Sequence, residues 1–282
     1  MTERVGVAIS TTGHEHRMGF LETCVEAWRK ALPLGSTLVV TVDGTEADAE
    51  RVRVVVDAPD GGRCGGNTYR AGQPQRPEWS LWSGRQGVAV NKNTGIELLM
   101  DAGVEHLFLC DDDAWPLYPQ SLDKHIALGY EHSMVCWGGS RLKPNPVSYA
   151  EWTWPRGVML YQTREVVARV GGMVEDFGIG GHEHAEYSQR IHNAGFTPAP
   201  FISPASYATR KATGAAALWH CEDMRKPGEL SSDHGHRRTK ITSVDTKARD
   251  WAKIQSVMDR MEGSTAFVPY RARENGRASA TL

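Results

Sequence analysis

The sequence predicts an α/β protein with a mostly parallel sheet flanked by helices and a less regular C-terminal extension. Short apolar, β-branched runs alternate with segments of helical periodicity through residue 110, as in parallel sheets with crossover helices. Two of these runs lead directly into aspartates, at Asp43 and at residues 111–113. Ligands of such sheets bind beyond the carboxyl ends of the strands, so we expect both aspartate positions on that edge.

The composition is that of an ordinary globular protein and excludes several classes. The chain has 282 residues and a net charge of -2, which gives no global basic field for nucleic acid. Its five cysteines form no CxxC pair, so a zinc ribbon or thioredoxin-like motif is not expected, and reduced thiols suit a cytoplasmic protein. No apolar run is long enough for a signal peptide or a membrane span, so we expect neither.

The first half of the chain predicts these elements in order. RVGVAIST predicts a buried strand, and MGFLETCVEAWRKAL has apolar residues at helical spacing up to the stop PLG. STLVVTVDG predicts the next strand, and RVRVVVD is compatible with a third. The Gly- and Pro-rich segment 58–79 predicts a loop, GVAVNKNTGIELLMDAG a helix and VEHLFLC another strand.

The second half continues the alternation and then becomes less regular. SLDKHIALGYEH predicts a helix and SMVCWGG a strand, and GVMLYQTREVVARVGG predicts a strand followed by a helix. HEHAEYSQRIHNAGF predicts one more helix. Beyond it we expect a helix in SVDTKARDWAKIQSVMDRMEG and a loose tail from residue 264, which divides the chain into a domain of residues 1–222 and an extension of residues 223–282.

The three consecutive aspartates in LFLCDDDAWP require a counter-charge, because each carboxylate resists ionisation beside its neighbours. A divalent cation would supply one, since Mg²⁺ and Mn²⁺ take oxygen ligands and bridge to substrate phosphates. Asp111 and Asp113 are two residues apart at a strand end and can point to the same side. The alternative is that the run only caps a turn or the next helix.

LFLCDDDAWP resembles the Asp-x-Asp region of nucleotide-sugar glycosyltransferases with the GT-A fold, a Rossmann-like and mostly parallel sheet. The resemblance implies that Asp113 binds Mn²⁺ or Mg²⁺, which grips the donor diphosphate. It implies that Asp111 contacts the ribose or the metal shell, and that Asp112 belongs to the same nucleotide site. GVAVNKNTGIELL is similar to the family helix that begins G-x-x-x-x-[RK]-N-x-G, which places Lys92 and Asn93 near the nucleotide.

Residues 156–195 resemble the second half of that family, which ends in GG-E-D-x-E-x-S-x-R. Gly157 matches the glycine that lets the acceptor approach the donor sugar, and Glu183 matches the family's glutamate. His184 stands where an aspartate, the catalytic base of inverting members, is usual. Histidine can do the same work because imidazoles titrate near neutral pH. Alternatively, His184 only orients the acceptor and Glu183 is the base, and inversion or retention stays open.

The resemblance spans residues 3–222 and adds three further positions to the site. His220 in ALWHCED matches the histidine that many metal-using members supply to the cation, and an imidazole ligand would favour Mn²⁺. The competing interpretation is a core histidine. Asp43, after the second strand, is expected to accept a hydrogen bond from the base or ribose, and the loop from Thr11 is expected to line the same pocket.

The predicted function is that of a metal-dependent glycosyltransferase. UDP-sugars are the commonest donors in the family, and the acceptor would be a hydroxyl of a protein, a glycan or a hydroxymethylpyrimidine base in DNA. Phage-type enzymes of this kind modify DNA or virion proteins. Basic and aromatic residues between Gly61 and Lys92 suit a DNA backbone, a donor diphosphate or a solvated loop equally: Arg63, Tyr69, Arg70, Arg76, Trp79, Trp82 and Arg85.

Three other classes compete with this prediction. A nucleotidyltransferase that makes nucleotide sugars would use a related sheet, but STTGHEHR lacks its glycine-rich signature. A non-catalytic module that binds glycans or nucleic acid is the second. The third is a zinc hydrolase built on His182, His184 and His220, although H-E-x-x-H is absent.

Overall fold

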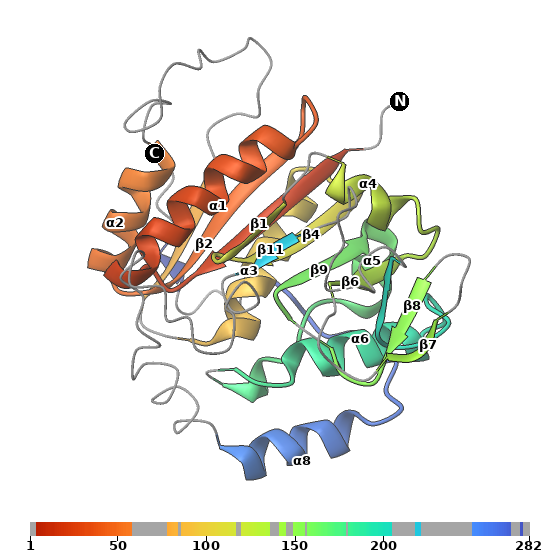
Figure 1. Ribbon diagram of the computed structural model, residues 1–282. Helices are drawn as coiled ribbons and strands as arrows, with labels where there is room; N and C mark the ends of the chain where they lie inside the picture. The colour runs from red at the N-terminus through yellow and green to blue at the C-terminus, as the bar shows by residue number, and fades with distance from the viewer. Residues whose placement is uncertain are drawn as a thin grey trace, which may run out of the picture.

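The structure is a computed structural model. It describes residues 4–57, 78–83, 86–116, 120–135, 141–144, 149–155, 157–178, 180–204, 218–220, 250–271 and 277–278. A seven-stranded sheet runs through its centre in the order β12-β3-β2-β1-β4-β9-β6 (Figure 1). The strands are β1 Val5–Thr11, β2 Thr37–Gly44, β3 Glu78–Ser83, β4 His106–Asp111, β6 His132–Met134, β9 Met159–Thr163 and β12 Arg277–Ala278.

The sheet is mostly parallel, as the sequence predicts. β3, β2, β1 and β4 pair in parallel, whereas β12 pairs antiparallel with β3, and β9 pairs antiparallel with β4 and β6. The strands β1, β2, β3 and β4 therefore end at one edge, and β9 begins there because it runs in the opposite direction. That shared edge carries the candidate site.

Helices cover both faces of the sheet (Figure 1). α1 (Met18–Ala31) follows the short helix η1 (Glu15–Arg17) and packs with α2 (Glu46–Asp57), whereas α3 (Val88–Asp101) packs against β1 and β2. The remaining elements are α4 Ser121–Ile126, α5 Arg164–Val170, η2 Glu175–Phe177, α6 Glu183–Asn193, α8 Trp251–Met261, and two small sheets made of β10 Ile202–Pro204, β8 Tyr149–Trp152 and β7 Arg141–Pro144, and of β11 Leu218–His220 and β5 Ala114–Pro116. None of the described helices is long and apolar enough to cross a membrane.

Alternate residues of the central strands build a separate core on each face. Ile9 belongs to the cluster that includes Trp28 of α1, whereas Ala8 belongs to the cluster on the side of α3. A Cβ at Gly95 would lie 2.6 Å from the Cβ of Ala8, so this glycine lets α3 approach the sheet closely. The close approach brings the first turn of α3 to the carboxyl edge.

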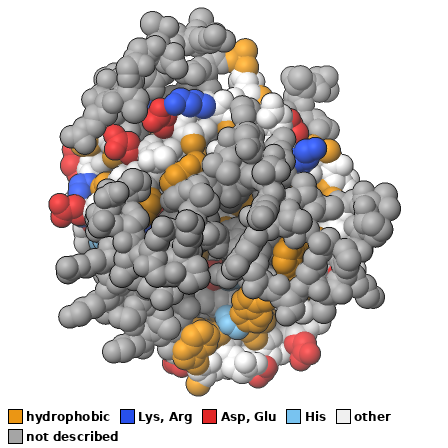
Figure 2. Space-filling model, in the orientation of Figure 1, with side chains coloured by type: hydrophobic (Ala, Val, Ile, Leu, Met, Phe, Trp, Pro, Cys, Tyr) orange, Lys and Arg blue, Asp and Glu red, His pale blue; other side chains and the backbone are white. Residues whose placement is uncertain are grey.

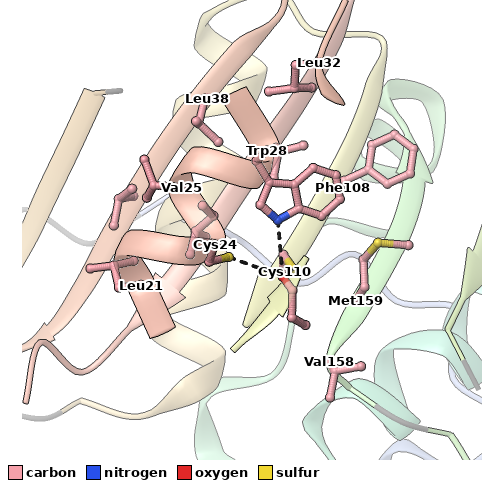
Figure 3. Close-up of a cluster of buried hydrophobic side chains, with 14 of the residues drawn as sticks. Leu21, Cys24, Val25, Trp28, Leu32, Leu38, Phe108, Cys110, Val158 and Met159 are labelled. Carbon is pink, nitrogen blue, oxygen red and sulfur yellow. Dashed lines mark hydrogen bonds between the residues drawn. The ribbon is translucent and has the colours of Figure 1, made fainter. Parts of the chain in front are cut away.

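Three buried donors on the opposite face hold the chain that follows the acidic run (Figure 3). The carbonyl oxygen of Ala114 accepts hydrogen bonds from Trp28 Nε1 at 3.3 Å, from Cys24 Sγ at 3.2 Å and from Cys110 Sγ at 2.9 Å. Trp28 and Cys24 lie fully buried on α1. Their hydrogen bonds therefore attach the residue after the turn of residues 111–113 to the core.

The prediction of a strand for RVRVVVD is wrong, because these residues form the end of α2. The cause is local capping: the backbone N–H of Thr45 donates to Asp48 Oδ2 at 2.8 Å, and that of Asp48 donates to Thr45 Oγ1 at 3.2 Å. This reciprocal capping box starts a helix, and the β-branched run continues it. The strand β3, which lies between β12 and β2, instead comes from residues 78–83, the first two of which we expected in a loop.

The C-terminal segment contacts the main body more closely than expected. Ile254 and Val257 of α8 pack with Val174 and Phe177 on and before η2. Farther along, the backbone of Val268 donates to Val170 and accepts from Gly172, so part of the expected tail runs beside the end of α5.

Candidate active site

The acidic run lies at the shared edge of the sheet, as its place after a strand predicts. Asp111 is the last residue of β4 and pairs in register with Ser10 of β1. Its side chain is one-third exposed, whereas Asp112 and Asp113 are buried. Two buried carboxylates are strongly destabilising unless positive charges or N–H donors neutralise them.

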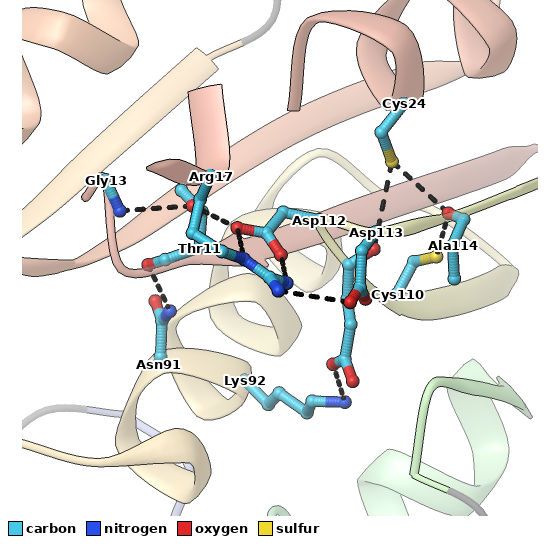
Figure 4. A network of polar contacts seen from close by, with 11 residues as sticks. Thr11, Gly13, Arg17, Cys24, Asn91, Lys92, Cys110, Asp112, Asp113 and Ala114 are labelled. Atoms are coloured by element: carbon cyan, nitrogen blue, oxygen red, sulfur yellow. Dashed lines mark hydrogen bonds and ion pairs between the residues drawn. The ribbon is translucent and has the colours of Figure 1, made fainter. Parts of the chain in front are cut away.

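Arg17 is the counter-charge of the two buried carboxylates (Figure 4). Its guanidinium makes two contacts to Asp112, one of them from Nε at 3.2 Å, and a third from NH1 to Asp113 Oδ2 at 3.1 Å. Thr11 Oγ1 also donates to Asp112 Oδ2 at 2.5 Å. Burial by itself would lower the pKa of Arg17, but the charges of both carboxylates raise it above its ordinary value.

Lys92 is the counter-charge of Asp111. Its Nζ lies 2.8 Å from Asp111 Oδ1 and donates to the carbonyl oxygen of Gly157 at 2.7 Å, and its side chain is buried. Burial opposes the charge, yet the interaction with Asp111 raises the pKa of Lys92. The pKa of Asp111 is itself raised, because burial and the neighbouring Asp113 outweigh the attraction of the lysine.

A histidine and a glutamate stand on the other side of Gly157. The imidazole of His184 packs so closely that a Cβ at Gly157 would lie 2.7 Å from its Nδ1. Glu183 Oε1 lies 3.2 Å from the same Nδ1, and its Oε2 accepts from the backbone N–H of Gly181 at 2.5 Å. Burial would raise the pKa of Glu183, but these hydrogen bonds and the imidazole lower it to about 2. Glu183 is therefore a fixed carboxylate that holds Nδ1 and leaves Nε2 of the ring for a proton from a substrate.

Five residues selected from the sequence thus lie in one cluster, in which four side chains surround Gly157: Lys92, Asp111, Glu183 and His184. Asp112 and Asp113 directly follow Asp111 and share Arg17, and Thr11 donates to Asp112. His220 has its backbone opposite Ala114 in the β11–β5 pair, directly after Asp113. Its side chain lies outside the described residues.

Two selected residues use their side chains within the protein. Both carboxylate oxygens of Asp43 accept from the backbone at the start of α3, from Gln86 N at 2.5 Å and from Gly87 N at 2.9 Å. Asn93 donates to Met173 O at 2.9 Å and accepts from Met173 N at 2.7 Å. Asp43 therefore helps to set the start of α3, and Asn93 joins α3 to the segment before η2.

Two residues of the cluster were not selected from the sequence. Arg17 follows the first strand by six residues, and its place in the loop at the carboxyl edge was the available signal. Asn91 donates from Nδ2 to Thr11 O at 3.1 Å, while its buried Oδ1 has no hydrogen-bond partner among the described residues. The position of Asn91 directly before Lys92 was the sequence feature that could have pointed to this residue. The basic segment of residues 61–77 lies outside the described residues.

The donor set fits a divalent cation only with help from a substrate. Within the described residues, no three histidine, cysteine, aspartate or glutamate side chains form a group that would hold a metal. Asp111 and Asp113 supply carboxylate oxygens, which suits Mg²⁺ or Mn²⁺ completed by substrate phosphates and water. Arg17 makes two contacts to Asp112 and one to Asp113, so Asp113 can bind a cation while the Arg17–Asp112 pair persists.

No family model and no curated protein sequence matches the chain. Among solved structures it is similar to a mannosyltransferase from Pyrobaculum calidifontis in complex with GDP-Man and Mn²⁺, with 18% identity and a TM-score of 0.47, covering 70% of this chain and 56% of that one. It is also similar to beta-1,4-galactosyltransferase 7 from Drosophila with manganese, UDP-Gal and xylobiose, at 15% identity and a TM-score of 0.43, covering 84% and 81%. A third similar structure is 4-diphosphocytidyl-2C-methyl-D-erythritol synthase from Anaerococcus prevotii, at 11% identity and a TM-score of 0.38, covering 59% and 73%.

Proposed function

We propose that the protein is a glycosyltransferase that moves a sugar from a nucleotide-sugar donor to a hydroxyl of a glycan or protein, with UDP-sugars as the first donors to test. One observation carries the proposal. A cluster of carboxylates and cations and a histidine–glutamate pair meet on two sides of Gly157, where Lys92 binds the carbonyl oxygen and His184 packs on the Cα. Such a site has separate places for a departing anion and for an attacking hydroxyl.

The carboxylate side suits the leaving group. A nucleoside diphosphate gains negative charge as its bond to the sugar breaks, and a divalent metal at Asp111 and Asp113 would neutralise that charge. Lys92 and Arg17 offset two of the three carboxylate charges beforehand, and the remaining negative charge favours a cation over a bare diphosphate. The same two cations hold Asp111 and Asp113 in place at the end of β4.

The histidine side suits the acceptor. Glu183 orients Nδ1 of His184, and Nε2 then takes the proton of the acceptor hydroxyl. The hydroxyl oxygen forms a bond to the anomeric carbon, and the bond from that carbon to the diphosphate breaks with its electron pair on the leaving group. The low pKa of Glu183 makes it a weak base, so we assign the base to His184 and the orienting role to Glu183.

The same pair weighs against a nucleotidyltransferase. In nucleotidyl transfer the attacking group is a sugar phosphate, which is already anionic and needs no base to remove a proton. An oriented imidazole is useful when the nucleophile is a neutral hydroxyl. A hydroxymethylpyrimidine acceptor in DNA stays a prediction, since most of the basic segment that suggested it lies outside the described residues.

A donor-hydrolysis screen tests the proposal. Nucleotide sugars are mixed with the protein with and without Mn²⁺, and the released nucleoside diphosphate is measured. We expect Mn²⁺-dependent release with at least one donor, and a loss of roughly 100-fold in His184→Ala. His192→Ala is the matched control, because His192 lies at the other end of α6 and bonds to Thr197 O. Pyrophosphate-dependent reversal without diphosphate release would instead indicate nucleotidyl transfer, and no turnover of any donor would indicate a binding module.

A further inference from the structure

Two half-exposed tryptophans flank a histidine at the start of α6. The ring of Trp154 lies 4.9 Å from that of His182, and the ring of Trp251 lies 5.9 Å from it, both at 77° to the imidazole. Trp154 is 51% exposed and Trp251 is 50% exposed. Figure 2 shows hydrophobic side chains gathered around a histidine at the lower edge of this face, in the region of α6 and α8. Large exposed aromatic groups close to a catalytic site are typical of ligand contacts.

The backbone at the centre of this cluster is also unusual. His182 has φ 67°, and within the described residues it is the only non-glycine residue with a positive φ. A left-handed conformation is unfavourable for a residue with a Cβ and persists only where its surroundings determine it, often at functional sites. Here it belongs to the residue whose imidazole contacts both indoles, two positions before His184.

We propose that Trp154, His182 and Trp251 form a platform for a neutral pyranose ring of the acceptor. The inference rests on the proposed function, because the platform adjoins the residue assigned as the base. The C–H face of a pyranose packs against indole rings while its hydroxyls stay available, and one of these would face His184. The platform also gives the C-terminal extension a role, since α8 contributes Trp251.

The nearby charges favour a neutral sugar over nucleic acid. Asp250 directly precedes Trp251 and caps α8, and Glu183 directly follows His182 as a buried carboxylate. Both would repel a phosphate backbone, whereas nucleic-acid platforms combine aromatic rings with positive charge. An uncharged ring meets no such repulsion.

Direct binding tests the platform without depending on catalysis. The wild-type protein is applied to an array of neutral oligosaccharides and to oligothymidylate, and the tightest saccharide is then titrated calorimetrically. We expect saccharide binding that weakens at least tenfold in Trp154→Ala and in Trp251→Ala and is largely retained in Trp251→Phe. Phe267→Ala is the matched control, because Phe267 is 51% exposed but belongs to a different aromatic pair, with Tyr270. Circular dichroism checks folding, and if Trp251→Ala does not fold, Trp154→Ala and Trp251→Phe still decide.

The proposal is overturned if the wild type binds no saccharide, if it prefers oligothymidylate, or if the alanine variants bind as the wild type does. Donor hydrolysis by the wild type is measured in parallel. Hydrolysis without saccharide binding removes the platform and leaves the transferase, whereas platform-dependent binding without hydrolysis of any donor removes the transferase and leaves a sugar-binding site.

Discussion

Arg17, in the short helix after β1, forms a two-point ion pair with Asp112, in the turn after β4. The two residues are 95 positions apart in sequence, and they meet because β1 and β4 are parallel neighbours whose carboxyl ends coincide. The pair joins the segment after β1 to the turn after β4. The guanidinium balances the charge of a buried carboxylate without an ion from solution.

Replacing Arg17 should destabilise the fold. Arg17→Met leaves Asp112 buried without its counter-charge, with only the hydrogen bond from Thr11, so we expect the free energy of unfolding to fall by ~3 kcal/mol. Urea unfolding followed by circular dichroism measures the change. Arg53→Met, which removes an exposed pair with Glu50 on α2, is the control and should leave stability unaltered. Equal stability of both variants would show that the Arg17–Asp112 pair is dispensable.

Metal removal should separate activity from stability. Arg17 and Lys92 offset two of the three carboxylate charges at residues 111–113, and each of the three side chains contacts one of these cations, so we expect the fold to persist without a metal there. We expect a chelator to abolish donor turnover while the thermal midpoint moves by less than about 2 °C, which for a chain of this size corresponds to less than about 1 kcal/mol. Added Mn²⁺ should restore turnover. A midpoint that drops sharply on chelation would mean that the carboxylates depend on bound metal.

Asp113→Asn should remove metal-dependent turnover. The amide keeps the shape of the side chain and one acceptor for Arg17, but it removes the charge that would bind a cation. We expect roughly a 100-fold loss in donor turnover, the size associated with losing one charge-stabilising group. Asp123→Asn, at an exposed position in the first turn of α4, is the control. Full turnover of Asp113→Asn at ordinary Mn²⁺ would end the metal assignment.

Gly157→Ala should damage activity far more than folding. The new methyl group would lie 2.7 Å from Nδ1 of His184, so the imidazole must move. A displacement of about 1 Å at a reacting group costs about 100-fold in rate. Gly19→Ala on α1 is the control, since nothing lies within 4 Å of that position and alanine favours a helix by ~0.5 kcal/mol. Transfer assays and unfolding curves of both variants test this, and a Gly157→Ala enzyme with normal turnover would contradict the placement of His184.

Glu183 should make stability depend on acid pH. Its pKa in the folded protein is about 2, below the ordinary value of 4.5, so its contribution is complete above pH 4.5 and is lost as the pH falls through about 2. The contribution reaches at most about 3 kcal/mol. Unfolding free energies of the wild type and Glu183→Gln should therefore diverge between pH 2 and pH 4.5 and then run parallel. Glu22→Gln, exposed on α1, is the charge-matched control. A constant difference across this range would show that the carboxylate is not held by His184 and Gly181.

Much of the site followed from local patterns in the sequence. The apolar run before Asp111 predicted a strand that ends in carboxylates, and β4 has that form. The helical spacing around Lys92 predicted α3, whose first turn lies at the same edge. Periodicity succeeded there because side-chain alternation and helical spacing are properties of short segments.

Local patterns failed where a capping contact or a distant partner decided the outcome. The β-branched run in α2 suggested a strand, but the reciprocal hydrogen bonds of Thr45 and Asp48 start a helix there. Nothing in the sequence indicated that the amide of Asn93 bonds with Met173, 80 residues away in sequence, and its contact with a nucleotide stays a prediction. A motif gives the order of residue types. It does not say whether a polar side chain will bond with a ligand or with a distant part of the chain.

The alternation of strands and helices and the carboxylates at the end of a strand could be predicted from the sequence, as could the pair of candidate bases, Glu183 and His184. The folded chain alone shows that Arg17 and Lys92 are the cations paired with these carboxylates, and that Glu183 contacts the imidazole of His184. This difference arises because a buried charge pairs with whichever group of opposite charge or hydrogen-bonding capacity the fold places within hydrogen-bond distance. In a parallel sheet those partners come from the ends of separate strands, far apart in sequence.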